Sequence, residues 1–250
     1  MGTKVKDYYD VNYGYFLSEK ISNVYENFDE EHFISLLKPE LETLSFNNRQ
    51  ILLAESLKST IQLNYDDTIY IFTKILGDEI EGSLGMFTQG WWLWPLSKYV
   101  ELYGYNNFEV STTFSKELTK RFTGEYCMRP IIESFPQRSM DLLLEWSLDD
   151  NKRIRRCASE CLRIRLPWAK KMYIALEWFD TYKQILTNLK DDTDKTIQKS
   201  VANNLNDLYK ESPELFEEII DSWKDENVTK ACTWIINYGS RTKRKVNLLS

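Results

Sequence analysis

One pattern recurs along the C-terminal half of this chain, and it constrains the fold more than any other feature. The first copy begins at Trp146 and reads WSLDDNKRIRRCASECL, and the second begins at Asn188 and reads NLKDDTDKTIQKSVANNL. Each copy has an acidic turn, a polar step, an isoleucine (Ile154 or Ile197), basic residues and a helix with small residues. A third copy, SWKDENVTKACTWII, lies near Trp223. A period of about 40 residues built from helix pairs is typical of HEAT and armadillo proteins. The alternative is chance similarity among amphipathic helices.

The rest of the sequence also favours helices. The chain has only 9 Gly and 6 Pro residues, apolar residues recur at helical spacing, and strands with clean alternation are hard to find. No Ser/Gly/Pro-rich linker divides it. We therefore expect a single all-α domain over residues 1–250, a HEAT-like helical-repeat solenoid with a concave face.

Composition and cysteine usage exclude several classes of protein. The formal net charge of -6 argues against a general nucleic-acid coat protein, although a local basic groove remains compatible with it. The only histidine is His32, and the four cysteines have no zinc-ligand spacing, so we expect no metal and no cofactor. Cys157 and Cys161 share a helix face and are expected to be buried thiols, with a redox or ligand role as the alternative. Without a signal peptide or an apolar membrane span, the sequence predicts a cytoplasmic protein.

The stretch RIRRCASECLRIRLPW, residues 153 to 168, places five arginines around one carboxylate, Glu160. We expect a helix over residues 153–164, with Asn151 as its N-cap and Pro167 closing the run. The core face of this helix carries Ile154, Cys157, Ala158 and Cys161. The opposite face carries Arg153, Arg156, Glu160 and Arg163.

This charged face has two interpretations. A ladder of ion pairs in solvent would contribute about 0.3–0.5 kcal/mol per pair and would account for the glutamate and one or two arginines. The remaining positive charge would be unpaired, and guanidinium groups suit phosphate oxygens. The pattern therefore favours a concave basic groove that binds DNA or RNA, with a solvated or protein-binding face as the alternative.

Two further segments extend this interpretation. The C-terminal RTKRKVNLLS, from Arg241, is basic and reaches the same groove if the third repeat stacks on the second. Glu125 lies about one repeat before Glu160, and stacking would bring the two positions to within about 10 Å. Glu125 also has Arg129 four residues on, so an ordinary ion pair is the alternative.

Several motifs resemble one known family. The segment SECLRIRLPW resembles the SEGTRPRLPW-type motif of the AlkC branch of the AlkC/AlkD-like DNA alkylation repair glycosylases, which are HEAT-like helical proteins. The resemblance extends in order from about residue 7 to residue 245 and includes YVELYGYNNFEVS, ELTKRFTGEYCMRPII, KSVANNLNDLYKESPEL and WIINYGSRTKRK.

The resemblance implies a monofunctional enzyme that cuts the N-glycosidic bond of cationic alkylated purines, chiefly 3-methyladenine, in double-stranded DNA and without base flipping. We expect the protein to be a monomer. It implies that Glu125 and Glu160 are catalytic and that Trp168 contacts the base or sugar, with packing at the helix corner as the alternative for Trp168. Backbone-binding residues that match the family are Arg156, Arg163, Ser200, Asn203, Arg241 and Lys245. A helix beginning at Lys199 is expected to present its N-terminal amides to DNA, with a capped polar face as the alternative.

Departures from the family motif leave a second hypothesis open. Cys161-Leu162 and Ile164 replace Gly-Thr and Pro, which is expected to lengthen the helix, and Tyr238 replaces a histidine. The immunoglobulin-like domain that some members carry at their C-terminus is expected to be absent. The alternative to the glycosylase is a non-catalytic HEAT-like protein that binds damaged or branched DNA. A third interpretation is a solenoid that binds proteins. We expect the tryptophans of WWLWP, residues 91 to 95, to be mostly core.

Overall fold

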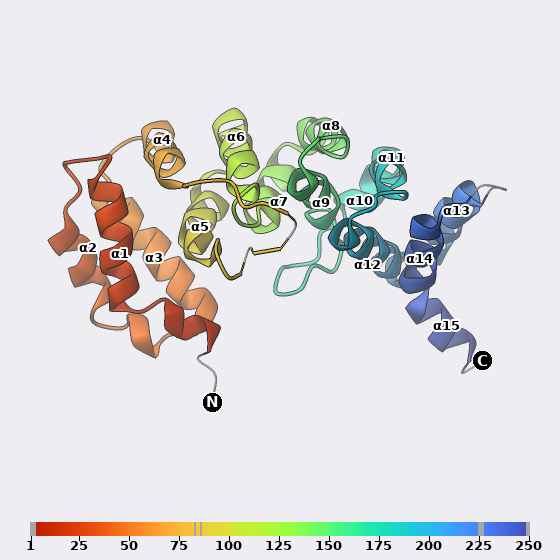
Figure 1. The fold of residues 1–250 in the computed structure, drawn as a ribbon, viewed down its shortest axis with the longest axis horizontal. Coiled ribbons are helices and arrows are strands. Elements are labelled where there is room, and N and C mark those ends of the chain that lie inside the picture. Colours follow the sequence, from red (N-terminus) through yellow and green to blue (C-terminus); the bar gives the residue numbers. More distant parts are fainter. Residues whose placement is uncertain (1–3, 83, 86, 225–227, 249–250) are drawn as a thin grey trace. The chain divides into compact units, whose positions relative to one another are not determined.

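A computed structural model describes residues 4–82, 84–85, 87–224 and 228–248 of the chain. Over these residues the protein consists of fifteen α-helices and three short 3-10 helices, and it contains no strand (Figure 1). The all-α prediction is therefore confirmed. The chain forms two compact units, one within residues 1–80 and 84–131 and the other within residues 81–83 and 132–250. The expectation of one domain over residues 1–250 stays a prediction.

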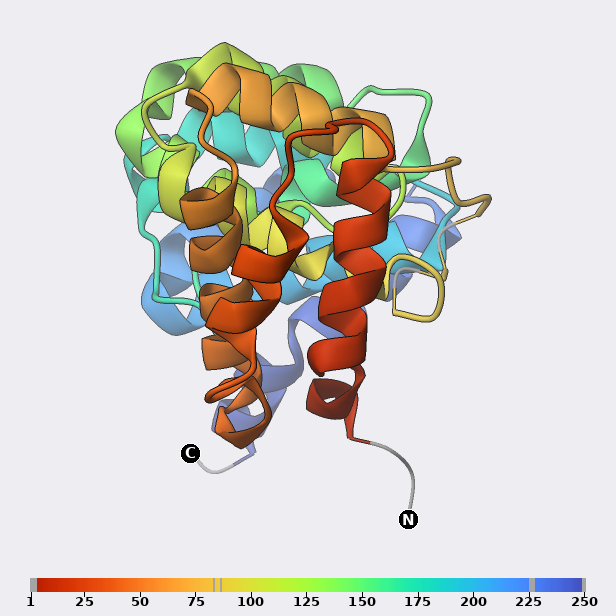
Figure 2. The ribbon, with the colours of Figure 1, turned by 90° about the vertical axis from the view of Figure 1, so that its left-hand side faces the viewer.

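The first unit contains six complete helices and the start of a seventh. Its helices are α1 (Val11–Ser22), α2 (Glu30–Leu37), α3 (Phe46–Thr60), α4 (Tyr65–Ile75), α5 (Trp94–Tyr103), α6 (Phe108–Thr119) and the first part of α7 (Glu125–Ser134). The helix α2 contacts both α1 and α3, and these three helices lie side by side in Figure 2. Further along, α3 packs against α5 and α4 packs against α6. Fully buried aromatic rings such as Phe33 and Phe72 fill the space between them.

The WWLWP segment lies in a 3-10 turn (Trp91–Leu93) and at the start of α5. Its tryptophans are half-buried, whereas Leu93 is fully buried. The Trp94 ring packs edge-on against Phe46, with ring centroids 4.7 Å apart. This contact joins the start of α3 to the start of α5, so the WWLWP segment has a packing role.

The second unit is built from stacked helix pairs. Its helices are α8 (Pro136–Trp146), α9 (Lys152–Glu160), α10 (Ile174–Glu177), α11 (Phe179–Leu189), α12 (Lys195–Glu211), α13 (Pro213–Trp223), α14 (Lys230–Gly239) and α15 (Arg241–Asn247). The helices α9, α12 and α14 contact one another in that order and form one layer. The helices α8 and α11 contact each other and belong to the other layer. This arrangement is the HEAT-like solenoid that the repeat predicted.

The internal repeat corresponds to a shared structural unit. In each copy an α-helix ends, a turn follows, and the next helix begins at a capped residue. The caps are Asn151, Asp194 and Thr229, whose side chains accept backbone N–H groups of the first turn. The third residue of each helix is fully buried, and these residues are Ile154, Ile197 and Cys232. Part of the third turn, residues 225–227, lies outside the described residues.

Candidate active site

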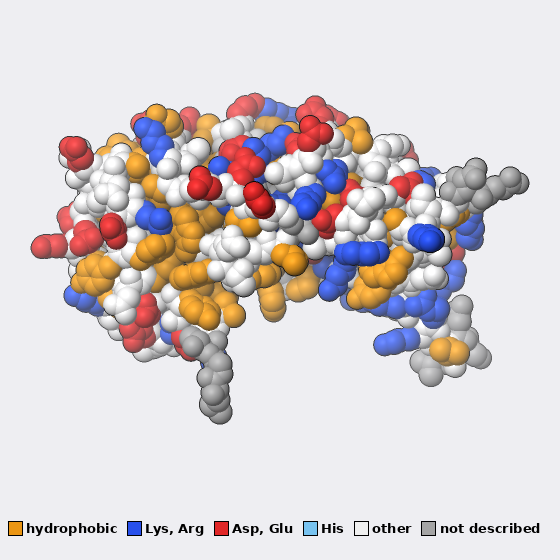
Figure 3. All heavy atoms as spheres, in the orientation of Figure 1, with side chains coloured by type: hydrophobic (Ala, Val, Ile, Leu, Met, Phe, Trp, Pro, Cys, Tyr) orange, Lys and Arg blue, Asp and Glu red, His pale blue; other side chains and the backbone are white. Residues whose placement is uncertain are grey.

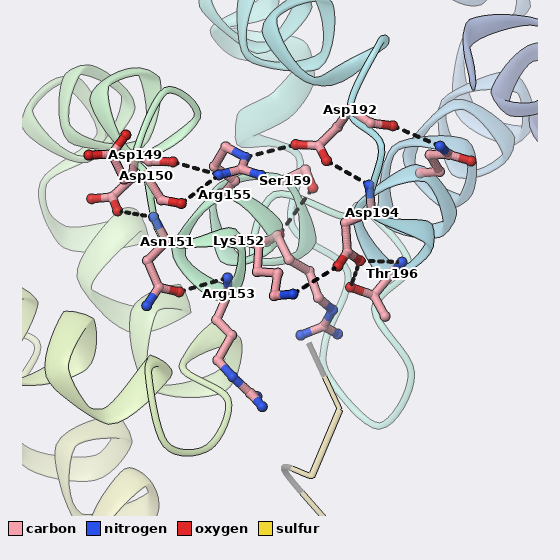
Figure 4. Close-up of polar contacts among 12 residues, drawn as sticks. Asp149, Asp150, Asn151, Lys152, Arg153, Arg155, Ser159, Asp192, Asp194 and Thr196 are labelled. Atoms are coloured by element: carbon pink, nitrogen blue, oxygen red, sulfur yellow. Dashed lines mark hydrogen bonds and ion pairs between the residues drawn. The ribbon is translucent and has the colours of Figure 1, made fainter. Parts of the chain in front are cut away.

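The acidic turns of two successive repeats meet at Arg155 (Figure 4). Its Nε donates to Asp192 Oδ2 at 2.7 Å, and its Nη1 donates to the carbonyl oxygens of Asp149 and Asp150 at 2.8 and 2.9 Å. Asp192 comes from the turn before α12, and the two carbonyls come from the turn before α9. Arg155 therefore joins neighbouring repeats, and its charge is balanced within the protein.

The helix α9 is shorter than the sequence predicts. It ends at Glu160, with Cys161 as its C-cap, and the expected helix over residues 153–164 is wrong in its last turn. Beyond the helix, two backbone hydrogen bonds join residues three apart, from Leu162 N to Ser159 O (3.2 Å) and from Arg163 N to Glu160 O (3.3 Å). The turn directs Arg163 toward α12, where its side chain meets a carboxylate. The expected apolar face is confirmed, because Ile154, Cys157, Ala158 and Cys161 are fully buried.

Glu160 lies at the C-terminal end of α9 and is only 7% exposed. Its Oε1 atom is 3.0 Å from Nη1 of Arg163 and 3.7 Å from Nη2 of Arg156. Burial alone raises the pKa of Glu160, but the guanidinium groups of Arg156 and Arg163 outweigh burial, so its pKa lies below the usual value. The Ser200 hydroxyl acts in the same direction. The site therefore holds a buried carboxylate in its charged form.

A second carboxylate holds Arg163 from the other side. The Nε of Arg163 lies 3.1 Å from Oδ2 of Asp207, which is 3% exposed on α12. Burial raises the pKa of Asp207, although the Arg163 guanidinium lowers it in part. Arg163 thus bridges α9 and α12 through Glu160 and Asp207. Its expected role in binding DNA phosphates stays a prediction.

The arginine-rich stretch carries less unpaired charge than its sequence indicates. Arg165 pairs with Glu211 at the end of α12, and Lys171 lies 2.9 Å from the same carboxylate. Arg155 and Arg163 are balanced by Asp192 and Asp207, as described above. The expectation that most of these arginines lack a protein partner is therefore wrong. The reason is that the acids follow 37, 44 and 46 residues later, about one repeat away.

Buried hydrogen bonds between α9 and α12 join the two helices next to Glu160. The hydroxyls of Ser159 and Ser200 are 2.7 Å apart, and both side chains are buried. Asn204 donates to the carbonyls of Ser159 (2.9 Å) and Ser200 (3.0 Å), and Tyr182 donates to Asn204 at 3.1 Å.

The helix α12 begins at Lys195, so the expected helix start at Lys199 is wrong. Residues 199–206 lie inside this helix, where their amides already have helical partners.

Trp168 is the last residue of the arginine-rich stretch. It lies in the loop between α9 and α10 and is 90% exposed. Its backbone has φ 61°, in the left-handed region that a tryptophan rarely adopts. This exposure excludes the alternative in which Trp168 packs against the helix corner. The loop therefore presents a large aromatic ring to solvent at a local backbone cost.

Glu125 belongs to the first unit, where it is the first residue of α7. The side chain is 5% exposed and accepts a hydrogen bond from the hydroxyl of Thr123. The N-terminal end of a helix favours a negative charge, so this position suits a carboxylate. Its catalytic role stays a prediction.

The remaining expected DNA-binding residues lie near the end of the second unit. Arg241 donates to Asn203 Oδ1 at 3.0 Å, and its guanidinium lies 4.6 Å from the centre of the Tyr238 ring. Lys245 is exposed on α15, where the basic C-terminal segment is helical. Figure 3 shows Lys and Arg side chains gathered over α12, α14 and α15. Residues 249–250 of that segment lie outside the described residues.

The described residues contain neither a metal-binding cluster nor a membrane-spanning helix. Among them, no group of three or more His, Cys, Asp or Glu side chains is placed to hold a metal ion. No helix in the described ranges has the length and apolar character needed to cross a membrane. All four cysteines are buried and none forms a disulfide within the described residues, in line with the expected buried thiols.

Sequence reasoning missed the carboxylates that face the arginines. These are Asp192, Asp207 and Glu211, all of which lie at or beyond the start of the following repeat. A search for acids one repeat after each arginine would have found them. Aligned repeats place such positions on adjacent helices of the same layer.

Comparison with known proteins relates this chain to one family. The profile of the family described as "DNA alkylation repair enzyme" matches residues 122–242. An uncharacterized protein of Bacillus subtilis, YhaZ, is 30% identical over 92% of this chain and 61% of its own length. The structure of the Pseudomonas fluorescens alkylpurine DNA glycosylase AlkC, bound to DNA containing an abasic site analog, is similar with a TM-score of 0.84 and 29% identity.

That structural match covers 98% of this chain and 66% of the AlkC chain, so our chain spans less than two thirds of either relative. The family profile covers α9, α12 and α14, the layer that carries Glu160 and its arginines. The match to AlkC extends through the first unit as well. The chain therefore resembles the AlkC/AlkD-like HEAT-repeat DNA alkylation repair proteins, in its matched segment of residues 122–242 and in its fold.

Proposed function

We propose that the chain is an alkylpurine DNA glycosylase, which hydrolyses the N-glycosidic bond of cationic purines such as 3-methyladenine in duplex DNA without base flipping. The observation that carries this proposal is Glu160, a buried carboxylate kept charged by Arg156 and Arg163. The match to the DNA alkylation repair profile and the similarity to a DNA-bound glycosylase support it. A buried charge of this kind requires partners, and it suits a reaction in which positive charge develops.

The proposed reaction needs little acid catalysis. Alkylation at N3 gives the purine a positive charge, so the base leaves as a neutral molecule when the bond to C1′ breaks. The sugar then carries oxocarbenium character, which a nearby carboxylate stabilises more than it stabilises the ground state. A water molecule attacks C1′ and loses a proton. Glu160 is able to orient this water molecule or to accept its proton.

Two further residues have proposed roles at the lesion. Glu125 is a second candidate carboxylate, held by Thr123 at the start of α7. Trp168 offers an exposed ring that can contact the cationic base or sugar. Such a cation–π contact contributes about 1–2 kcal/mol when it is shielded from water.

The DNA backbone is proposed to lie along the α9, α12 and α14 layer. Lys245 is exposed, while Arg156, Asn203 and Arg241 are half-buried at this layer and keep part of their surface in solvent. Arg163 and Ser200 also match the family but are buried, which favours support of Glu160 over direct phosphate contact. Phosphate contacts release counterions, so binding is expected to weaken with salt.

A non-catalytic DNA-binding protein is the second candidate function. The observation that favours it is that two guanidinium groups balance the charge of Glu160, because such pairing is also found in purely structural ion pairs. The altered motif residues Cys161, Leu162 and Ile164 are fully buried, so they replace the family's Gly, Thr and Pro inside the core.

One experiment separates the two functions. Purified protein is incubated with methylated duplex DNA, and free 3-methyladenine is measured for the native protein, Glu125→Gln and Glu160→Gln. The proposal expects release by the native protein and a decrease of at least about 100-fold for a catalytic carboxylate. Salt-sensitive DNA binding without any base release would contradict the enzyme and support the binding protein.

A further inference from the structure

Asp207 is a buried acid that the proposed mechanism does not use. It lies on α12, and its Oδ2 is 3.1 Å from the Nε of Arg163. The opposite edge of the same guanidinium is 3.0 Å from Oε1 of Glu160. All three side chains are almost fully buried. The Arg163 guanidinium therefore links Asp207 on α12 to the candidate catalytic carboxylate.

The ion pairs of Arg163 fix a long side chain that lies outside the helices. Arg163 lies three residues beyond the end of α9. A long side chain in such a position loses considerable entropy when it is fixed. Two carboxylates on two edges of a planar guanidinium fix both the position and the orientation of its plane. Without Asp207, the Nε edge would lose its charged partner.

The four charged groups that pair directly in this cluster balance one another. Glu160 and Asp207 carry two negative charges, and Arg156 and Arg163 carry two positive charges. The groups that face Asp207 also include the Lys210 ammonium on its own helix, the Tyr182 hydroxyl from α11 and the Arg241 guanidinium from α15. The Ser200 hydroxyl from α12 faces Glu160. Removing the charge of Asp207 therefore leaves a buried excess of positive charge next to Arg163, which favours movement of Arg163 toward solvent.

We infer that Asp207 is a positioning residue, which holds Arg163 against Glu160 and so keeps the Glu160 carboxylate in place and charged. This inference rests on the proposed function for its catalytic consequence. The contact between Arg163 and Glu160 is a property of the protein itself and has a readout that does not need activity.

The first test measures the titration of Glu160 by carbon-13 NMR on protein labelled at the glutamate carboxyls. The signal is assigned with Glu160→Gln. Loss of the Asp207 charge by itself would lower the Glu160 pKa, whereas movement of Arg163 away from Glu160 would raise it. In Asp207→Asn we expect movement of Arg163 to dominate and the Glu160 pKa to rise. The matched control is Asp192→Asn, which removes the carboxylate that pairs with Arg155 from the turn before α12 and is expected to leave the Glu160 pKa unchanged. An unchanged or lowered Glu160 pKa in Asp207→Asn would overturn the inference.

The second test uses Arg163→Lys, which keeps a positive charge but lacks the two donor edges. If Asp207 acts through Arg163, the double variant should titrate like Arg163→Lys alone, whereas independent action would give additive changes and contradict the inference. If Asp207→Asn does not fold, Asp207→Glu, which keeps the charge but displaces the carboxylate, is titrated in its place, and an unchanged Glu160 pKa would again overturn the inference. The same proteins are assayed for base release at saturating DNA, where we expect Asp207→Asn to lose at least tenfold in rate with unchanged DNA affinity. Absence of release by the native protein would contradict the proposed function alone, and the titration would still decide the inference.

Discussion

Arg163 Nη1 lies 3.0 Å from Oε1 of Glu160, in a cluster that is almost entirely buried. The pairing joins the two residues that the sequence motif separates by only two positions, and it fixes the ionisation of the glutamate. Because the folded protein holds the pKa of Glu160 below its usual value, folding favours the charged form. The stability of the protein should therefore depend on pH through this residue.

We expect the native protein to be more stable than Glu160→Gln at neutral pH. For a carboxyl whose folded pKa is lowered, the added stability is present above the unfolded pKa of about 4.3 and is lost as pH falls through the folded value. The difference in the free energy of unfolding should thus be constant above about pH 5 and should shrink below about pH 4. Urea unfolding at a series of pH values measures it. A difference that does not change with pH would contradict the lowered pKa.

Trp168 offers a test in which stability and activity should separate. A residue at φ 61° carries a backbone cost that glycine avoids, so Trp168→Gly is expected to raise the free energy of unfolding by about 1 kcal/mol. The ring is 90% exposed and contributes little packing. Base release from methylated DNA should fall about tenfold if the ring contacts the cationic purine. Trp168→Phe, which keeps an aromatic face, should retain most of the activity, and equal rates for the native and glycine proteins would exclude the contact.

Gly239 allows α14 to approach α12 closely. A Cβ at this position would lie 2.8 Å from Leu205 Cβ and 3.2 Å from the carbonyl oxygen of Ala202. Overpacking of this kind costs about 1–3 kcal/mol, and the better helix propensity of alanine offsets up to about 1 kcal/mol of it. Gly239→Ala should therefore lower the free energy of unfolding by about 1–2 kcal/mol, as measured by urea denaturation. Thr233→Ala, at an exposed site on the same helix, is the control and should change stability by less than about 0.5 kcal/mol.

Lys245 tests where the DNA backbone lies. It is exposed on α15, and a phosphate contact there should release about one counterion. Lys245→Gln is expected to weaken binding to any duplex sequence and to reduce the slope of log affinity against log salt by about 0.9. The control is Lys224→Gln, because Lys224 is exposed and pairs with Asp221 at the end of α13. Equal slopes for the native protein and Lys245→Gln would remove α15 from the proposed interface.

The order and type of the helices in the second unit follow from local information. Asn151, Asp194 and Thr229 cap helices through bonds to their own neighbouring amides, and such bonds depend only on nearby residues. The buried face of α9 follows from the 3.6-residue period of its apolar side chains. The motif residues could also be identified from the sequence, because short segments carry the family resemblance.

The tertiary structure decided what the arginines do. Arg155, Arg163 and Arg165 face acids 37, 44 and 46 residues away, and no local rule pairs residues at such distances. The stacking of one repeat on the next creates these pairs, and it converts an apparent excess of positive charge into buried bridges. The sequence by itself determined the helices, their repeat and the family resemblance, since these depend on neighbours along the chain. Only packing decided that Glu160 is buried and charged and that Asp207 contacts the Arg163 guanidinium beside it. Both features depend on contacts between helices from different repeats.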